Sequence, residues 1–73
     1  MKEGNIVNNI RKLRFLHGEM TQAELADRVG VTRQTINALE AAKYSPSLEL
    51  AFKIAFEFNS DLEDVFQYQT EES

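Results

Sequence analysis

The segment from Thr21 to Lys43, TQAELADRVGVTRQTINALEAAK, most constrains what this chain can fold into. Apolar residues recur at helical spacing on both sides of Gly30, which predicts two short helices joined by a tight turn. Glycine enters the left-handed backbone region at little cost, so it suits the point where the chain reverses. Two short helices with a glycine in the turn between them have the layout of a helix-turn-helix.

Local signals place the ends of both helices. Thr21 followed by Glu24 forms a capping box, in which each side chain bonds to the backbone N–H of the other residue. Thr32 is the expected cap of the second helix. Ala26 stands where the two helices should cross, because a larger side chain would push them apart. The expected core residues of this pair are Leu25, Val29, Val31, Ile36 and Leu39.

Two further helices are expected to flank the pair. One precedes it, with Ile10, Leu13 and Leu16 at helical spacing and Gly18 near its end. The other follows a loop and begins after the cap Ser47. Its broad apolar face is formed by Leu50, Ala51, Ile54, Ala55 and Phe58, with Phe52 and Phe56 beside it.

The C-terminal part predicts a short fifth helix and a strand. Asn59 tolerates the left-handed conformation that ends helices, and Ser60 with Glu63 forms a second capping box. Residues 66–69 alternate between apolar and polar, which is a strand signal, and Ile6-Val7 is a second candidate strand. Pairing of the two strands would add a small antiparallel sheet to an all-α, five-helix domain.

Length and composition narrow the functional class. A chain of 73 residues is expected to form one domain, here residues 1–69, with a disordered tail over 70–73. The absence of cysteine excludes disulfides, thiolate metal sites and cysteine nucleophiles. No run reaches the roughly 18 apolar residues of a membrane span, and the first residues, MKEGNIVNN, form no apolar signal region. The expected location is therefore the cytoplasm, and no cofactor is implied.

The net charge of −4 is divided unevenly along the chain. Residues 1–46 hold seven Lys and Arg against five Asp and Glu, a balance of +2, whereas residues 47–73 hold one against seven, a balance of −6. The first part can therefore face phosphate groups while the C-terminal part faces away from them. Chance clustering would give the same numbers, so charge alone does not separate the two interpretations.

The outward residues of the second helix of the pair carry the chemistry of base recognition. Arg33, Gln34 and Asn37 remain outward once the apolar positions face the core. Arg can pair with two acceptors on guanine, and Gln or Asn can pair with adenine. Each residue alone is more often part of a solvated helix face, but the set together with the glycine and small-residue spacing favours binding to double-stranded DNA. The expected phosphate contacts are Thr32, Thr35 and the helix N-terminus at Gln22.

The chain resembles the lambda/434 phage repressor and Cro family, also called the XRE-like regulators, in TQAELADRVG followed by TRQTINALE. It is also similar, in KYSPSLELAFKIAFEFNSDLEDVF, to short stand-alone regulators such as the cytolysin repressor of enterococci, in which a small strand follows the helices. The resemblance covers residues 6–69. It implies a transcriptional regulator, expected to be a repressor, that binds a palindromic operator as a homodimer through the major groove.

The resemblance also implies roles for single residues. Gln22 matches the glutamine that opens the second helix and contacts phosphate, and Lys43 matches a basic residue near the DNA backbone. Tyr44 is similar to the aromatic residue found there in the short regulators, so Lys43 and Tyr44 join the expected phosphate contacts. In the 434 repressor, glutamines occupy the positions of Arg33 and Gln34 and contact bases. Arg33 is thus a departure that should shift the preferred sequence toward guanine.

A second departure lies at Ala41-Ala42, where the family usually has Asn-Gly. That glycine ends the third helix in a left-handed turn, and an alanine in this conformation costs about 1 kcal/mol or more. Either Ala42 accepts this strain, or the helix runs further and displaces Lys43 and Tyr44.

A late apolar stripe is formed by Leu62, Val65 and Phe66, which repeat at helical spacing. One interpretation is that they complete the core of the monomer. The other, which we favour, is that the four preceding helices close the core and leave the stripe exposed as an interface. In the short regulators, the equivalent stripe meets its copy across a two-fold axis. The expected dimer interface comprises Leu62, Val65, Phe66, Phe58 and Ser45.

Other polar residues offer no competing chemistry. His17 is expected at the surface near a helix C-terminus, and a metal site would need partners that the chain does not supply. Asp61, Glu63 and Asp64 lack the glycine and the bidentate end of a cation-binding loop, so capping and solvation explain them. No nucleophile has a base to activate it, so an enzyme is not expected.

A rival from another class is a protein-interaction module. It would bind another protein through the acidic C-terminal third, as an antitoxin or an anti-repressor, with DNA binding secondary. A tight protein complex together with negligible operator specificity would distinguish it from a DNA-binding regulator.

Overall fold

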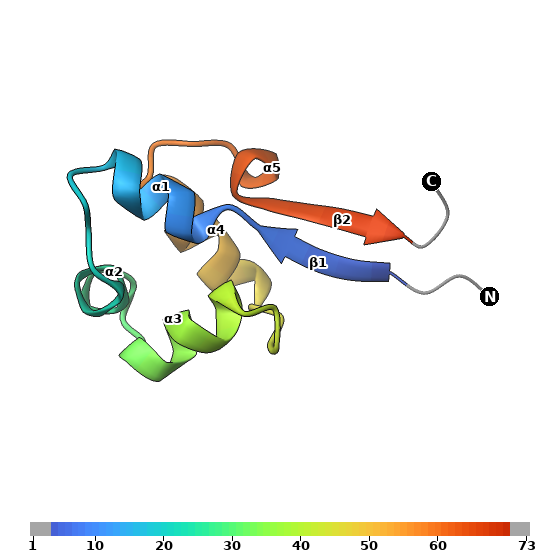
Figure 1. Ribbon diagram of the computed structural model, residues 1–73, viewed down its shortest axis with the longest axis horizontal. Coiled ribbons are helices and arrows are strands. Elements are labelled where there is room, and N and C mark those ends of the chain that lie inside the picture. The colour runs from blue at the N-terminus through green and yellow to red at the C-terminus, as the bar shows by residue number, and fades with distance from the viewer. Residues whose placement is uncertain (1–3, 71–73) are drawn as a thin grey trace.

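Two strands and five helices follow one another in the computed structural model, which describes residues 4–70 (Figure 1). The first strand, β1, covers Gly4–Asn8, and the last, β2, covers Phe66–Thr70. The helices between them are α1 (Ile10–Leu16), α2 (Gln22–Val29), α3 (Arg33–Glu40), α4 (Leu48–Glu57) and α5 (Leu62–Val65). The predicted architecture, five helices with a small sheet, is confirmed.

The two strands join the ends of the described chain. They pair antiparallel, with Ile6 opposite Tyr68 and Gly4 opposite Thr70. In Figure 1 this ribbon projects from the helical body. The predicted strand pairing is therefore confirmed. Thr70, which the sequence placed in a disordered tail, belongs to β2 because it pairs with Gly4, and residues 71–73 lie outside the described part of the chain.

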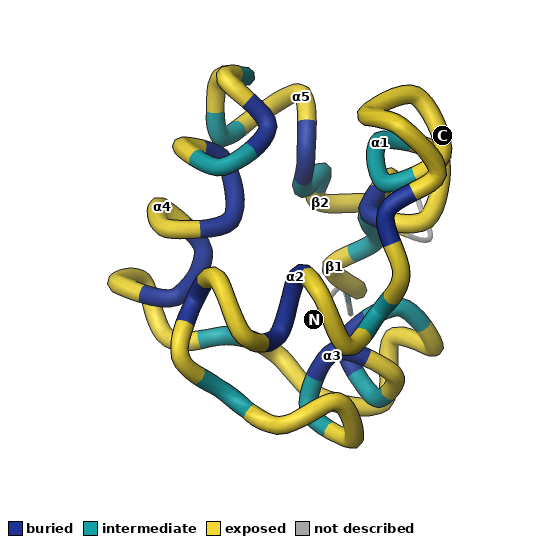
Figure 2. Tube along the Cα trace, turned by 90° about the vertical axis from the view of Figure 1, so that its left-hand side faces the viewer, coloured by how far each residue is buried: buried dark blue, intermediate teal, exposed yellow. Residues whose placement is uncertain are grey.

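One apolar core holds the helices together (Figure 2). All the residues predicted to face inward from α2, α3 and α4 are buried, and Val31 packs against them half-buried. Leu16 departs from the prediction, since its side chain is 62% exposed at the end of α1. The largest fully buried side chains are Phe58, Ile10, Leu25, Ile36, Leu39, Ile54 and Val65.

The core is not closed by the first four helices, contrary to the prediction. Val65 of α5 is 0% exposed, and Phe58, which caps the end of α4, is 1% exposed. Both side chains therefore fill the monomer core and present no surface to a partner, so their assignment to a dimer interface is wrong. Leu62 and Phe66 remain half-buried and Ser45 is exposed, which leaves these three accessible.

Helix starts follow the predicted capping residues at α2, α3 and α4. Thr21 and Glu24 form the expected capping box, with N···O distances of 3.0 Å and 2.9 Å for its two hydrogen bonds. The hydrogen bond from the Thr21 backbone N–H, followed by one with the Thr21 side chain, lowers the pKa of the Glu24 carboxyl group. Thr32 and Ser47 cap the other two helices by accepting from backbone N–H groups three residues later.

The capping of α5 differs from the prediction by one residue. The cap is Asp61, whose backbone N–H donates to the Asp64 carboxylate at 3.2 Å. Ser60 and Glu63 do not form the predicted box, because Ser60 completes the end of α4. Its hydroxyl donates to the Phe58 carbonyl at 3.0 Å, just after Asn59 adopts the left-handed conformation expected of it, with φ of 51°.

Asn8 and Asn9 anchor the ribbon to the helices. The Asn8 side-chain amide donates to the Leu39 carbonyl in the last turn of α3, at 2.7 Å. The Asn9 backbone N–H donates to the Val65 carbonyl at 2.8 Å, and its side-chain amide donates to the Asp64 carbonyl at 3.0 Å. The last carbonyls of a helix have no partner within it, so Asn8 at the end of β1 stabilises the end of α3, and Asn9 just after β1 stabilises the end of α5.

The end of α3 departs from the usual chemistry of a helix end. Ala42 has a φ of 58°, where the Cβ of an L-residue is crowded. The N–H groups of Ala42 and Lys43 donate to the carbonyls of Leu39 and Ala38, each at 3.0 Å, which is the Schellman arrangement that favours glycine. α3 thus ends at Glu40 and does not run further, so Ala42 accepts the strained conformation.

We expect Ala42→Gly to stabilise the protein by up to about 1 kcal/mol, because glycine adopts this φ without crowding. The greater freedom of glycine in the unfolded chain offsets part of the gain. Thermal unfolding should show a rise in Tm of up to roughly 4–8 °C. Ala41→Gly is the matched control, since Ala41 has a φ of −81°, and it should lower Tm. A lower Tm for Ala42→Gly would contradict the strained turn.

Candidate nucleic-acid interface

α2 and α3 pack against each other across a turn at Gly30. The N–H groups of Gly30 and Val31 both donate to the Ala26 carbonyl, at 2.9 Å and 3.0 Å. Gly30 has a φ of 79°, and a Cβ placed on it would meet no atom within 4 Å. The backbone conformation alone therefore favours glycine here. Ala26 is 3% exposed, which confirms that this position is closely packed.

The three residues predicted to read bases lie together on the outer side of α3. Arg33, Gln34 and Asn37 are all exposed, and their spacing places them on one helix face, away from the buried Ile36 and Leu39. Within residues 4–70, no hydrogen bond or ion pair holds their side chains. They are thus free to meet an external partner from a helix that the core fixes in place.

Thr32 and Thr35 bond to each other at the start of α3. The Thr32 hydroxyl accepts from the Thr35 backbone N–H at 3.2 Å, and the two hydroxyl oxygens lie 3.0 Å apart. One of the two hydroxyl groups donates its hydrogen to the other, so the second hydroxyl hydrogen remains available to a phosphate oxygen. Thr32 is exposed whereas Thr35 is half-buried. Moreover, the first turn of α3 carries no acidic residue, which leaves the positive end of the helix dipole uncompensated.

Gln22 at the start of α2 is hydrogen-bonded to Glu40, which forms an ion pair with Arg14 that was not predicted from the sequence. The Arg14 guanidinium donates to both Glu40 oxygens, at 2.6 Å and 3.0 Å, and to the Met20 carbonyl at 2.8 Å. The Gln22 amide donates to Glu40 at 3.2 Å. The network therefore links α1, α2 and α3, and it leaves one N–H of the Gln22 amide free for a phosphate.

A sequence signal for this ion pair existed. Arg14 stands four residues after the core residue Ile10, and Glu40 stands four after the core residue Ile36. Residues four apart share a helix face, so both charges lie beside the core, where an unpaired charge is costly. Their side chains are 15% and 11% exposed.

Lys43 and Tyr44 follow the left-handed turn at the end of α3. Both are exposed, with Tyr44 at 47%, and the turn keeps Lys43 next to the last residues of α3. Tyr44 also borders a hollow beside the ribbon that Ile6 and Tyr68 line. The structure thus brings Lys43 to the end of α3, while Tyr44 lies between α3 and the strands.

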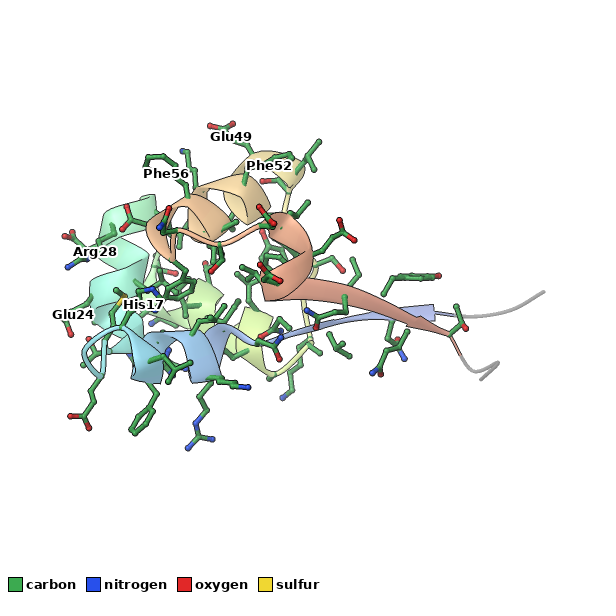
Figure 3. All side chains as sticks on the ribbon, turned by 90° about the horizontal axis from the view of Figure 1, so that it is seen from above. His17, Glu24, Arg28, Glu49, Phe52 and Phe56 are labelled. Carbon is green, nitrogen blue, oxygen red and sulfur yellow. The ribbon has the colours of Figure 1, made fainter. Side chains whose placement is uncertain are left out.

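His17 lies at the surface as predicted. It caps the end of α1, with its Nδ1 2.8 Å from the Leu13 carbonyl oxygen, and its ring is tilted against that of Phe58 at 5.2 Å between centroids (Figure 3). In the described part of the chain, no three His, Asp or Glu side chains gather as metal ligands. No helix in residues 4–70 has the length and apolar character needed to cross a membrane.

Comparison with known proteins places this geometry in a family. Residues 10–65 match the family model described as helix-turn-helix. An uncharacterized HTH-type transcriptional regulator of Methanocaldococcus jannaschii is 51% identical over 65 residues, which cover 89% of this chain and 97% of the relative. Another, from Archaeoglobus fulgidus, is 56% identical over 63 residues, covering 86% and 89% of the two chains.

Relatives also occur among bacteria. An uncharacterized HTH-type transcriptional regulator of Bacillus subtilis is 45% identical over 64 residues, covering 88% of this chain and 96% of the relative. A crystal structure from Bacteroides fragilis, described as a candidate DNA-binding protein, superimposes with a TM-score of 0.73 at 26% identity, over 85% of this chain and 98% of that one. The chain therefore belongs to the helix-turn-helix family of transcriptional regulators.

Proposed function

We propose that this DNA-binding regulator acts as a sequence-specific repressor, with α3 in the major groove of its operator. The observation that carries the proposal is the exposed face of Arg33, Gln34 and Asn37, whose side chains have no partner within residues 4–70. A helix fixed by the core and offering these donors fits the major groove, where guanine and adenine present matching acceptors. Thr32, Gln22 and Lys43 then lie where phosphate contacts would set the orientation of α3.

We infer further that the chain binds DNA as a homodimer. Leu62 and Phe66 line an apolar hollow of about 270 Å³. Ile6 and Leu48, which also line it, are 39% and 68% exposed. A two-stranded ribbon gains little stability by itself, so a second copy covering this side would stabilise it. A two-fold dimer would present two α3 helices to half-sites about one helical turn, roughly 34 Å, apart.

Selection of bound sequences from a random duplex pool tests this function. We expect an enriched palindrome whose half-site centres are about 10 base pairs apart. A variant that combines Arg33→Ala, Gln34→Ala and Asn37→Ala is the control and should enrich nothing. A single enriched half-site would keep DNA binding but overturn the dimer. No enrichment with the native chain would overturn sequence-specific binding and favour the protein-interaction module.

We expect Arg33→Ala to weaken operator binding by roughly 1–3 kcal/mol and to relax the preference at one base pair. The reason is that alanine cannot make the paired hydrogen bonds of a guanidinium with guanine. Binding to operators with each base at that position, measured at one salt concentration, would show both effects. Arg11→Ala, which removes the same charge from an exposed site on α1, should retain the preference. Equal weakening for every sequence would instead make Arg33 a phosphate contact.

A further inference from the structure

A second apolar surface lies on α4, away from the residues proposed to contact DNA. Phe52 and Phe56 are 53% and 82% exposed, and they stand four residues apart on one side of the helix. In Figure 3 both rings point outward from the helical body, on the same side as Glu49. Exposed rings at helical spacing contribute little to the monomer core. A contiguous exposed apolar patch typically marks an interaction site.

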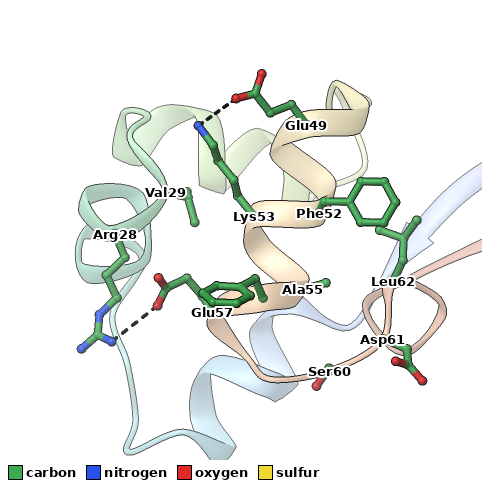
Figure 4. Close-up of a pocket in the computed structure, with 11 residues that line it drawn as sticks. Arg28, Val29, Glu49, Phe52, Lys53, Ala55, Glu57, Ser60, Asp61 and Leu62 are labelled. Atoms are coloured by element: carbon green, nitrogen blue, oxygen red, sulfur yellow. Dashed lines mark ion pairs between the residues drawn. The ribbon is translucent and has the colours of Figure 1, made fainter.

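The two rings border an open groove of about 770 Å³ (Figure 4). It runs from the end of α2 across α4 to the start of α5, and Val29 and Ala55 contribute apolar lining. Figure 4 shows the Phe52 ring directed toward Leu62 at one side of the groove. This open groove with apolar lining is of the kind that accepts the apolar face of a helix.

Charged residues border this groove with an excess of acid. Lys53 pairs with Glu49 at 3.2 Å, and Arg28 pairs with Glu57 at 3.6 Å. The positive charge of each base is therefore balanced by a neighbouring carboxylate. Asp61 also lines the groove, so its charged lining residues are three acids and two bases, a balance of −1. The acidic charge that remains at Asp61 favours a partner with basic residues over nucleic acid or anionic lipid.

We propose that this groove binds an amphipathic helix of another protein, with apolar residues facing Phe52 and Phe56 and Lys or Arg at the flanks. The apolar lining of the groove would bury the apolar face of the partner helix, and the acidic residues at its border would favour basic residues at the flanks of that helix. None of the residues assigned to bases or phosphates lines the groove, so the partner helix can bind while α3 occupies DNA. The inference does not depend on operator binding.

Titration of the full chain with two synthetic peptides tests the proposal. One is an amphipathic helix of Leu and Lys, and the other has the same Leu positions with Glu in place of Lys. We expect the Lys peptide to bind at least about tenfold more tightly and to shift the backbone amide resonances of residues in the groove. Phe56→Ala should weaken this binding at least about tenfold, because it removes an apolar anchor.

Phe15→Ala is the matched control, since Phe15 is also an exposed ring, at 65%, but lies on α1. It should leave peptide binding unchanged, and Phe56→Ala should keep both its operator affinity and its mass in solution. Absence of binding by the Lys peptide, equal binding of the Glu peptide, or an equal loss in Phe15→Ala would overturn the proposal. A reduced mass for Phe56→Ala would assign the groove to a second copy, and binding of the native chain to phosphatidylglycerol vesicles would assign it to a membrane surface.

Discussion

Glu40→Ala should destabilise the protein by about 3 kcal/mol, because it leaves the Arg14 guanidinium beside the core with only the Met20 carbonyl as a partner. The pair is 15% and 11% exposed, so water can reach it, and we take the lower end of the range for buried ion pairs. A domain of this size has a total stability of only a few kcal/mol. The substitution should therefore remove a large part of the free energy of unfolding.

Thermal unfolding would show this loss as a fall in Tm of roughly 12–24 °C. Glu49→Ala is the matched control, since Glu49 pairs with Lys53 but its side chain is 79% exposed, and it should cost less than about 1 kcal/mol. A double-mutant cycle with Arg14→Ala would give the coupling between the two charges. If Glu40→Ala costs no more than Glu49→Ala, the network does not hold α1, α2 and α3 together.

Much of this fold could be predicted because its signals are local. Thr21 with Glu24 specifies where α2 begins, and Gly30 specifies where the chain turns, since each acts on residues within one helical turn. The predicted base-reading residues follow from the same local pattern, because fixing the inner face of α3 also fixes its outer face. The strain at Ala42 was one of two alternatives that the sequence left open, at a position where glycine is usual.

Features that depend on contacts between distant segments were not foreseen. Arg14 and Glu40 are 26 residues apart, and neither forms a local pattern with the other. Asn8 bonds to Leu39 across 31 residues, and this contact exists only once the ribbon has formed. Val65 was assigned to the surface for a related reason: helical spacing shows which residues share a face, but it does not show what that face meets.

The burial of Val65 restricts where the dimer interface can lie. With Val65 in the core, Leu62 and Phe66 are what remains accessible of the late apolar stripe. Phe66 is the first residue of β2 and pairs with Asn8, while Ile6 pairs with Tyr68. Paired residues, and residues two apart on one strand, share a side of the sheet, so Phe66 and Ile6 lie on the same side of the ribbon. The proposed interface therefore combines the start of α5 with one side of the ribbon, whereas the sequence had predicted the late apolar stripe with Phe58 and Ser45 beside it.

Leu62→Asp should convert the proposed dimer to a monomer and lower operator affinity by about 10²–10⁴-fold, because two linked recognition helices bind far more tightly than one. A carboxylate at this position would lose its water on association without gaining a partner. Sedimentation equilibrium would measure the mass, and titration with a labelled operator would measure the affinity.

Leu16→Asp is the matched control for this substitution. Leu16 is 62% exposed on α1, away from the proposed interface, so the variant should keep both its mass and its operator affinity. A Leu62→Asp protein that retains the dimer mass and the native affinity would place the interface elsewhere. One that remains dimeric yet loses affinity would show instead that Leu62 sets the angle between the two subunits, because a changed angle moves one α3 out of register with its half-site.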